Sequence, residues 1–263
     1  MMKVRDIAAA LEEFAPLPLQ ESYDNAGLIV GAPDDEVTCA LLCVDITEEV
    51  MDEAEAYGAD MIVAHHPIIF NPIKRLNGTT YIERVVARAI RRGIALYACH
   101  TNLDSTEGGM SWRLAEMLGI ENLHVLESTR KDQPEVGFGV VGTLPQPELT
   151  LDFLARMKRT LNVGAVRYSR INTPTIERVA LCTGAGASLM NEARKSGAQL
   201  YIAADFKYNN FLDADRDLII ADIGHFESEY CAIQLMFDVL SKKLPNFALR
   251  KSANAINPIN YLV

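Results

Sequence analysis

The chain has 263 residues, of which 49% are hydrophobic and 23% charged, a composition typical of a globular protein with one large domain or two smaller ones. Its formal net charge of −10 argues against a nucleic-acid-binding protein, because such a protein needs a basic surface to contact phosphates. No apolar run approaches the ~18–20 residues that span a bilayer, which argues against a membrane protein.

The N-terminal segment is expected to form an amphipathic helix. Val4, Ile7, Leu11 and Phe14 recur at helical spacing with acidic residues between them, which is typical of a surface helix and not of a signal peptide. The five cysteines form no CxxC motif and have apolar neighbours, so we expect reduced, mostly buried thiols. Both features predict a cytoplasmic protein.

Short apolar strands then alternate with helical patterns. In chain order, the expected elements are a strand at 38–45, a helix at 48–58, a strand at 59–66, an arginine-rich helix at 83–93, a strand at 93–100 and a helix at 109–119. This alternation predicts a mainly parallel sheet covered by helices.

The arginine-rich helix has two interpretations. Its basic residues form either a solvated face that complements the helix C-terminus or a rim that attracts an anionic substrate. The sequence favours the first. The residues are Arg84, Arg88, Arg91 and Arg92.

Residues 178–205 repeat the first βαβ unit at a constant offset and without a gap. The matching pairs are Leu42 with Leu181, Cys43 with Cys182, Met51 with Met190, Glu53 with Glu192, Ala54 with Ala193, Gly58 with Gly197, Ala59 with Ala198, and Ala64 with Ala203. The repeat predicts an internal duplication that gives two similar α/β domains with mainly parallel or mixed sheets covered by helices.

The passage between the halves is expected in a polar segment rich in Pro and Gly, residues 127–150. The C-terminal residues 247–263 are too short for a domain and are expected to return to the first half as a final strand. The predicted domains are therefore 1–127 together with 240–263, and 128–239.

Two adjacent histidines, His65 and His66, end an apolar strand and precede Pro67. Neighbouring side chains of a straight strand point to opposite faces, so both imidazoles can line one site only if the chain turns there, which Pro67 favours. Sites in open α/β sheets form at the carboxyl ends of strands. A lone histidine could equally be a core or capping residue, but the pair indicates a functional site.

In each half, a strand also ends at a histidine, and an acidic residue follows four positions after that histidine. His225 and Glu229 share one helix face if a helix begins after Gly224; otherwise they are a helix-start histidine and a solvated glutamate. His100 and Asp104 are expected in a polar loop, where Asp104 could instead bond its own backbone.

Taken together, these imidazoles and carboxylates form a ligand set of nitrogen and oxygen atoms without thiolate. Such a set suits zinc, iron, manganese or a similar divalent ion, and its size is sufficient for two ions. A glycine-containing turn, with Gly184 and Gly186, could bind phosphate, but it lacks the full phosphate-binding patterns, so a plain tight turn is favoured.

Five motifs then carry a resemblance to a known family. They occur along the chain in the order YDNAGLIVG, DMIVAHHPIIF, CHTNLDS, YIAADFKY and DIGHFESE. Together they resemble the motifs of the Nif-three-like family, whose members are also called GTP cyclohydrolase 1 type 2 homologues. The resemblance runs from about Val4 to the C-terminus. It implies a dinuclear metal centre in the cleft between two similar α/β domains, and a ring-shaped homohexamer.

The resemblance also implies the roles of individual residues. His100, which the duplication would pair with His225, would lie beside the ions, where it orients a ligand or transfers protons. Glu229 would bridge the two ions. By motif, the metal ligands would be His65, His66, Asp104, His225 and Glu229.

The implied function is that of a metal-dependent hydrolase with two divalent ions per chain. Its substrate would be a small anion, either a nucleotide in a reaction of the GTP cyclohydrolase type or a phosphoester. The alternative is a non-catalytic protein that regulates through metal binding or handles metal ions. Substrate choice depends on segments that depart from the family pattern at Tyr23, Ala203, Ala204 and Asn209.

Overall fold

The computed structural model describes residues 2–262, which divide into two compact units. The first unit runs to Leu103 and resumes over Ala232–Ile256, and the second comprises Asp104–Cys231 and the residues from Asn257 onward. The domain boundaries predicted from the sequence differ from this division chiefly at residues 104–127, which fall in the second unit.

The first unit contains one main sheet with helices on both faces. Its elements are β1 (Met2–Lys3), α1 (Val4–Glu12), the 3-10 helix η1 (Leu17–Leu19), β2 (Gly27–Val30), β3 (Glu36–Val37), β4 (Cys39–Cys43), α2 (Glu48–Tyr57), β5 (Met61–Ala64), α3 (Tyr81–Arg92), β6 (Ala95–Ala98), α4 (Thr101–Ser105), which crosses the unit boundary, α10 (Cys231–Lys243) and β13 (Ala248–Lys251).

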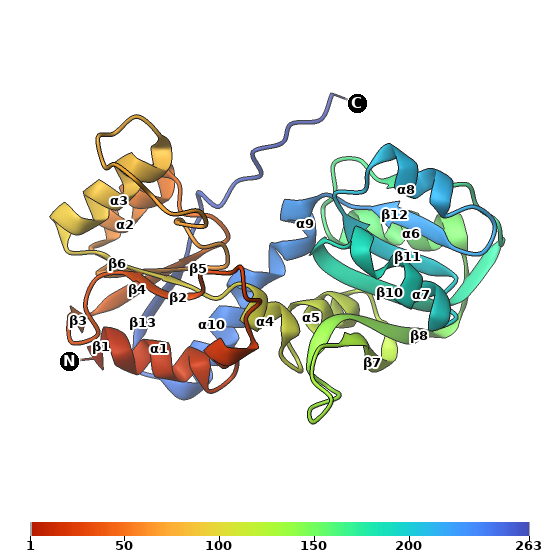
Figure 1. Ribbon diagram of the computed structural model, residues 1–263, viewed down its shortest axis with the longest axis horizontal. Helices are drawn as coiled ribbons and strands as arrows, with labels where there is room; N and C mark the ends of the chain where they lie inside the picture. The colour runs from red at the N-terminus through yellow and green to blue at the C-terminus, as the bar shows by residue number, and fades with distance from the viewer. Residues whose placement is uncertain (1, 263) are drawn as a thin grey trace. The chain divides into compact units, whose positions relative to one another are not determined.

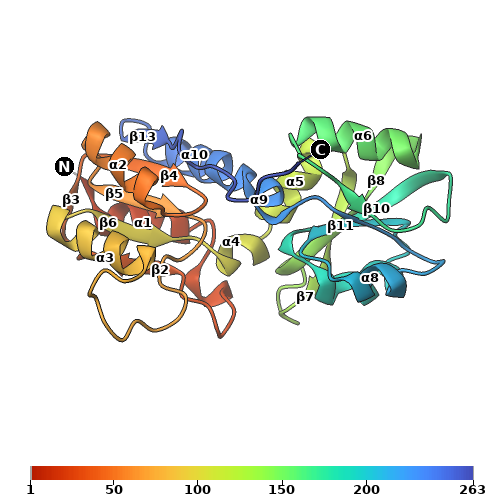
Figure 2. The same cartoon turned by 90° about the horizontal axis from the view of Figure 1, so that it is seen from above.

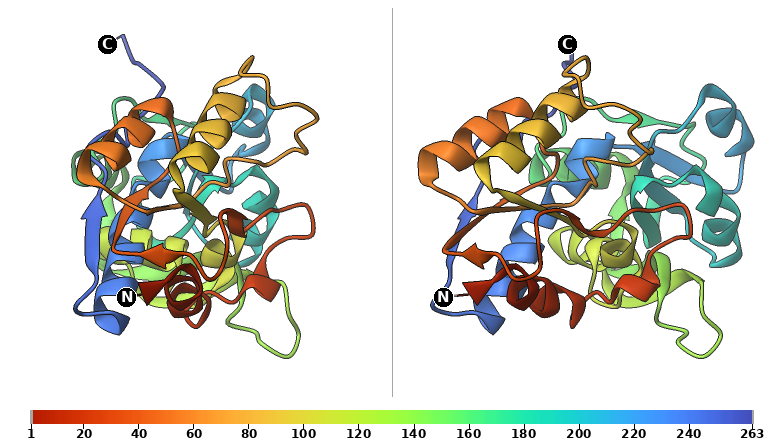
Figure 3. Two further views of the ribbon diagram at one scale, coloured as in Figure 1. Left: turned by 90° about the vertical axis from the view of Figure 1, so that its left-hand side faces the viewer. Right: turned by 60° about the vertical axis from the view of Figure 1, so that its left-hand side comes forward.

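The sheet of the first unit has the strand order β13-β4-β5-β6-β2. Strands β13, β4, β5 and β6 are parallel, and β2 pairs antiparallel with β6. Helices α2 and α3 cover one face, and α1 and α10 cover the other (Figure 1, Figure 3). Both faces are therefore buried, which explains why β4, β5 and β6 read as continuous apolar runs.

Several expected elements of this unit are confirmed. The N-terminal helix is α1, and β13 returns the C-terminal segment to the sheet beside β4. Helix α2 begins at an N-cap, Thr47, whose side chain accepts a hydrogen bond from Val50 N, and it ends at Gly58 in the left-handed conformation. One expectation was wrong: residues 101–105 form the short helix α4 and not a polar loop.

The second unit is also a sheet covered on both faces. Its elements are α5 (Met110–Met117), β7 (Glu121–Ser128), β8 (Gly137–Leu149), α6 (Thr150–Thr160), β9 (Arg167–Tyr168), β10 (Thr175–Ala185), the 3-10 helix η2 (Ala187–Leu189), α7 (Met190–Lys195), β11 (Leu200–Ala204), α8 (Tyr208–Asp213), β12 (Ile219–Asp222) and α9 (His225–Glu229).

The strand order in the second sheet is β7-β8-β10-β11-β12-β9, with β10, β11 and β12 parallel. Alternate residues of these strands contribute to two separate cores. One core packs the sheet against α5 and α6, and the other packs it against α7 and the residues around α8. Figure 2 shows these two pairs of helices on opposite faces of the sheet.

The two sheets share a pairing register. Ala40 pairs with Met61 in the first unit, and Val179 pairs with Leu200 in the second, so both partners recur 139 residues later. The next strand recurs after 124 residues, because Ala95 and Ile219 occupy the same register position. The antiparallel edge strands β2 and β9 also correspond. An internal duplication predicts such a recurrence.

Two further expectations concern the whole chain. All five cysteines are buried free thiols, as predicted. Within residues 2–262, no helix has both the length and the apolar character that crossing a bilayer requires.

Candidate metal centre

Three imidazoles gather at the carboxyl ends of parallel strands in the first unit. His65 and His66 follow β5 directly, and His100 follows β6 by two residues. The ring centroids of His65 and His66 lie 5.0 Å apart, and each lies 5.4 Å from that of His100. Strand β5 ends at Ala64, so His65 and His66 do not follow the alternating side-chain directions of a straight strand. This is the condition under which both imidazoles were expected to line one site.

Each of these imidazoles has its Nδ1 atom next to an oxygen acceptor. His65 Nδ1 lies 2.7 Å from the carbonyl oxygen of Cys99, and His66 Nδ1 lies 2.8 Å from Asp45 Oδ1. His100 Nδ1 lies 2.7 Å from Asp24 Oδ1. An oxygen partner places the proton on Nδ1, which leaves Nε2 as the nitrogen that can coordinate a metal ion.

Asp24 connects the loop before β2 to the end of β6. Its Oδ2 atom accepts hydrogen bonds from the backbone N–H of Thr101, at 3.0 Å, and from the Thr101 hydroxyl. Burial raises the pKa of Asp24, but the hydrogen bonds from His100 and Thr101 outweigh burial and hold the pKa at about 2. Asp24 is therefore a carboxylate at neutral pH and an acceptor for His100.

The second unit places His225 and Glu229 one helical turn apart on α9. His225 Nε2 lies 3.0 Å from Glu229 Oε2, and His225 Nδ1 lies 2.7 Å from Asp205 Oδ2. The predicted helix after Gly224 and the shared helix face are therefore confirmed. Burial lowers the pKa of His225, but hydrogen bonds and charge from Glu229 and Asp205 outweigh it and raise the pKa to about 9.

A glycine at the end of β10 makes room for the Glu229 carboxylate. Gly184 has φ +63°, and a Cβ atom there would lie 2.3 Å from Glu229 Oε1. Its backbone N–H donates to Ser228 Oγ at 2.8 Å, and that of Gly186 donates to Ala204 O at 3.4 Å. These N–H groups bond within the fold, which agrees with the tight-turn interpretation of this segment.

Asp104 lies in the same unit as His225 and Glu229. Its Oδ1 atom accepts a hydrogen bond from Thr183 Oγ1 at 3.3 Å, next to Gly184. Burial, followed by the charges of Asp104 and Glu229, raises the pKa of the buried Cys182 thiol to about 12. Both carboxylates therefore act on the same end of β10.

The donor atoms within each unit fit a divalent cation. The first unit offers imidazoles whose tautomer is set by oxygen acceptors, and the second offers an imidazole and two carboxylates. These are the ligand types of zinc, iron and manganese sites. The geometry of the first unit does not separate His100 from His65 and His66, so its assignment to a position beside the ions stays a prediction.

The carboxylates that hold the Nδ1 atoms were missed as site residues. Asp24, Asp45 and Asp205 were not predicted to contact histidines, although Asp205 directly follows β11 and Asp45 follows the end of β4 by two residues. Position after a strand was the signal that located the histidines, and it would also have found these two. Asp24 precedes β2 and gave no such signal.

The pairing register does not align the two strand-end histidines in the way that the sequence repeat suggested. By the pairing register, His100 corresponds to Gly224, one residue before His225. The two histidines therefore leave their strands at different positions. His225 lies within the helix α9, whereas His100 precedes α4.

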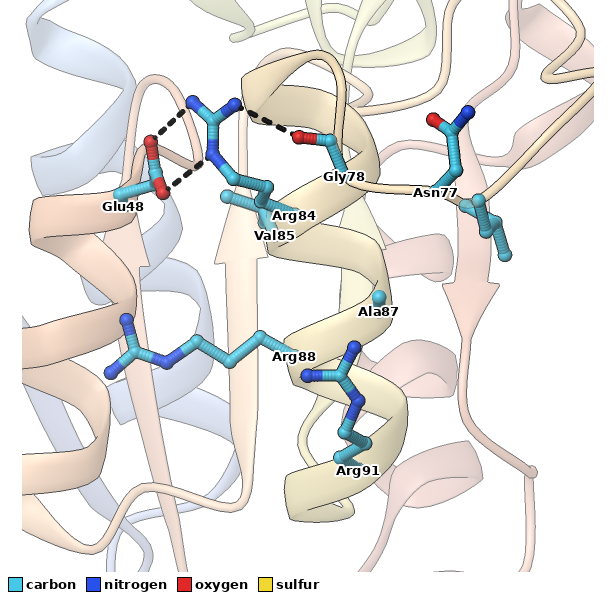
Figure 4. A pocket seen from close by; sticks show the side chains of 9 residues that line it. Glu48, Asn77, Gly78, Arg84, Val85, Ala87, Arg88 and Arg91 are labelled. Carbon is cyan, nitrogen blue, oxygen red and sulfur yellow. Dashed lines mark hydrogen bonds and ion pairs between the residues drawn. The ribbon is translucent and has the colours of Figure 1, made fainter.

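The arginine-rich helix α3 is paired with acidic residues of α2. Arg84 forms two hydrogen bonds with Glu48, and Arg88 pairs with Asp52 and Glu55. A pocket of about 340 Å³ lies beside these pairs (Figure 4). The partial neutralisation of its arginines favours a clamp between two helices over a rim that attracts anions.

The residues that depart from the family pattern have different environments. Ala203 and Ala204 are buried in β11, where larger side chains would meet the core. Asn209 is exposed in α8. Tyr23 is 63% exposed and contacts Phe70.

Comparisons with known proteins give a consistent result. The sequence profile of the family described as Duf34/NIF3 (NGG1p interacting factor 3) matches residues 2–258. A Clostridium perfringens protein named GTP cyclohydrolase 1 type 2 homolog is 34% identical over 92% of this chain and 93% of its own length.

Solved structures show the same fold. A Bacillus cereus protein related to NIF3 superposes with a TM-score of 0.91 at 23% identity, and covers 99% of both chains. A Staphylococcus aureus protein gives a TM-score of 0.91 at 26% identity, again over 99% of both chains. The predicted α/β architecture is thereby confirmed.

Proposed function

Because the chain belongs to the Duf34/NIF3 family, we propose that it is a metal-dependent hydrolase with a dinuclear centre. The observation that carries the proposal is the shared arrangement of the histidines. Each has Nδ1 held by an oxygen atom at the carboxyl end of a strand, which prepares Nε2 for a metal ion. The proposed ligands are His65, His66, Asp104, His225 and Glu229.

The residue types of both units support one shared ligand set. His65, His66 and Glu229 each offer one atom of a kind that binds metal ions. Asp104 and His225 add a second carboxylate and a further imidazole. Where two ions bind close together, one carboxylate could hold both, and we assign this role to Glu229.

The proposed reaction is hydrolysis of a small anionic substrate. When bound, a pair of divalent ions supplies Lewis acidity, which activates water and stabilises charge on a substrate oxygen. The chain's own contribution is to orient the ligands through Asp45 and Asp205 and to move a proton through His100, which Asp24 holds in place. The name of the curated relatives favours GTP as the substrate to test first.

Metal analysis tests the ligand set. Purified protein loaded with zinc, iron or manganese should contain two equivalents per chain by elemental mass spectrometry. His65→Ala, His66→Ala and Glu229→Ala should each lose metal. His124→Ala is the matched control, because this fifth histidine is exposed on β7. A loss of metal from His124→Ala equal to that from His65→Ala would reject the assignment.

Turnover separates the enzyme from its alternative. Metal-loaded wild-type protein should hydrolyse GTP or a phosphoester, and His100→Gln should retain two metal equivalents while its kcat falls by about 10²–10⁴-fold, the usual contribution of a proton-transfer group. Metal binding without turnover of GTP or of a phosphoester panel would instead support a regulatory or metal-handling protein.

The assembly and the location are also proposals. A ring-shaped homohexamer should sediment with six times the mass of one chain, and a monomer or dimer at micromolar concentration would contradict it. The cytoplasmic assignment predicts that a fluorescent fusion fills the cytoplasm.

A further inference from the structure

Two exposed aromatic rings lie beside the histidines of the first unit. Tyr23 is 63% exposed and Phe70 is 45% exposed. Their ring centroids lie 6.2 Å apart, with 62° between the ring planes. Phe70 in turn lies 6.1 Å from the ring of His100, at 83°. A contact chain of rings therefore runs from the surface to the candidate metal ligands.

The loops that carry these two rings are tied to each other and to the site. Tyr23 precedes Asp24, whose carboxylate contacts His100 and Thr101. Asn25 donates a hydrogen bond from Nδ2 to the carbonyl oxygen of Ile69, at 2.6 Å, and Ile69 directly precedes Phe70. One hydrogen bond therefore ties the loop of Tyr23 to the loop of Phe70, and the contact of Asp24 with His100 joins the first of these loops to the site.

Burial does not explain the positions of these rings. The core cluster of β4, β5, β6, α2 and α3 is built mainly from aliphatic residues and includes neither Tyr23 nor Phe70. A ring that leaves much of its area in water adds little to that core. Two such rings at an angle form a corner, and each can offer a face or an edge to a third flat ring, which is how aromatic groups contact one another.

We propose that Tyr23 and Phe70 are specificity-determining residues that bind a planar heteroaromatic ring of the substrate next to His100. The inference rests on the proposed function, because it narrows the substrate class of that same site. It favours a nucleotide over a phosphoester without a ring. Aromatic side chains stack on any base, since every base has a π-face, so the corner selects for flatness and not for one particular base.

The test compares two ligands that differ mainly in the base. Binding of guanosine 5′-monophosphate and of ribose 5-phosphate to the metal-loaded full chain is measured by calorimetry. The wild-type protein should prefer the nucleotide. Phe70→Leu and Tyr23→Leu should each weaken nucleotide binding by about 5- to 100-fold, the range expected for loss of one stacking contact, while binding of ribose 5-phosphate should stay unchanged.

Two control variants make the result specific. Tyr23→Phe keeps the ring and should retain nucleotide affinity. Tyr57→Leu replaces a tyrosine of similar exposure, 47%, at the end of α2, and should also have no effect. Because α2 begins after the carboxyl end of β4, its last residue lies toward the opposite end of the parallel sheet, away from the histidines.

Three outcomes would overturn the proposal. These are equal affinity of the wild-type protein for both ligands, no binding of either, and nucleotide binding that neither leucine variant weakens. If both leucine variants fail to fold, saturation-transfer NMR on the wild-type protein decides instead, because the purine protons should receive more saturation than the ribose protons.

The result is independent of the proposed hydrolysis. Nucleotide binding that depends on the rings, without turnover, would reject the hydrolase and keep the ring site. Turnover of GTP that the leucine variants leave unchanged would support the hydrolase and reject the ring site. Metal content is measured for every variant, so that loss of ions is not mistaken for loss of stacking.

Discussion

At the scale of single residues, orientation by carboxylates is the main feature of the candidate centre. Asp45, Asp24 and Asp205 each contact Nδ1 of one histidine at 2.7–2.8 Å. Such partners fix the ring tautomer and raise the basicity of the other nitrogen. The site therefore depends on residues that need not touch a metal ion.

Removing one of these charges should weaken metal binding without removing a ligand. Asp45→Asn and Asp205→Asn should each raise the Kd for zinc by about 10–100-fold, as measured by competition with a chromogenic chelator. Asp34→Asn is the control, because Asp34 pairs with Lys3 and Arg5 and not with a histidine. An unchanged Kd in both site variants would show that the carboxylates do not act through the imidazoles.

Replacing Gly184 should have two separate effects. One comes from its left-handed backbone conformation, and the other from the space that its missing side chain leaves for Glu229. Gly184→Ala introduces a Cβ atom 2.3 Å from Glu229 Oε1, at φ +63°. Gly197→Ala has a similar φ, +76°, but its nearest neighbouring atom would lie 3.9 Å away. Both variants should lose about 1–2 kcal/mol of unfolding free energy from left-handed strain, measured in urea.

Only Gly184→Ala should also lose metal, because its added atom displaces the carboxylate of Glu229. Elemental analysis of the two variants provides this comparison. Equal metal content in Gly184→Ala and Gly197→Ala would mean that Glu229 tolerates displacement or is not a ligand.

At the scale of secondary structure elements, Glu53 ties the C-terminal segment to the sheet. It is a buried residue of α2, and its carboxylate accepts hydrogen bonds from Ser252 Oγ at 2.6 Å and from the backbone N–H groups of Ala253 and Asn254. Burial raises the pKa of Glu53, but these hydrogen bonds outweigh burial and lower the pKa. The residues involved follow β13, so the contact secures the edge of the first sheet.

This depressed pKa predicts a pH-dependent contribution to stability. The contribution is fully present above the unfolded pKa of about 4.3 and is lost as the pH falls through the lower folded value. Glu53→Gln should therefore unfold about 1–3 kcal/mol more easily at pH 7. The difference from wild type should shrink in acid, as followed by urea titrations between pH 3 and pH 7.

The repeat supplies a control for this prediction. Glu192 matches Glu53 in the sequence repeat, but its carboxylate pairs with Lys195 at the surface. Glu192→Gln should change the unfolding free energy by no more than about 0.5 kcal/mol. A pH-independent loss in Glu53→Gln would contradict the assigned cause.

Much of the element order was predictable because local patterns agree with the tertiary fold. Apolar runs gave β4, β5 and β6, and the amphipathic spacing after Gly224 gave the helical segment of α9 and α10. Helix α4 was missed because its five residues lie in the polar segment HTNLDS. Two of its buried residues, Thr101 and Asn102, bond to Asp24 and to Ala15, partners distant in sequence.

At the scale of the whole molecule, the proposed ligands belong to two compact units. His65 and His66 are in the first unit, and Asp104, His225 and Glu229 are in the second. A metal centre that takes ligands from both should stabilise both. At a zinc concentration 100 times the Kd, the gain in unfolding free energy should be about 2.7 kcal/mol.

Hydrogen exchange read by mass spectrometry can test this for each unit separately. Zinc should slow exchange in peptides of β5–β6 and of β10–β12 alike, and EDTA should reverse both effects. His66→Ala should abolish the protection in both units, whereas His124→Ala should retain it. Protection confined to one unit would mean that the two ligand sets do not serve the same ions.

The two-unit organisation and the histidines of the candidate site could be predicted from the sequence. The repeated βαβ pattern indicated the two units, and the adjacent histidines at the end of an apolar run indicated the site. The contacts of Asp24 and Phe70 with His100 could not be predicted from the sequence. Asp24 contacts His100 across 76 residues of chain, and Phe70 contacts it across 30 residues. No local pattern encodes such distances.

The repeated strand register also shows where the two units differ in the length of a connecting segment. Between the second and third parallel strands, the first unit has 15 more residues than the second, since the offset falls from 139 to 124. That longer crossover carries Phe70. A unit of this architecture can thus gain a new side chain by lengthening a loop, while the strand pairings that both units share stay in place.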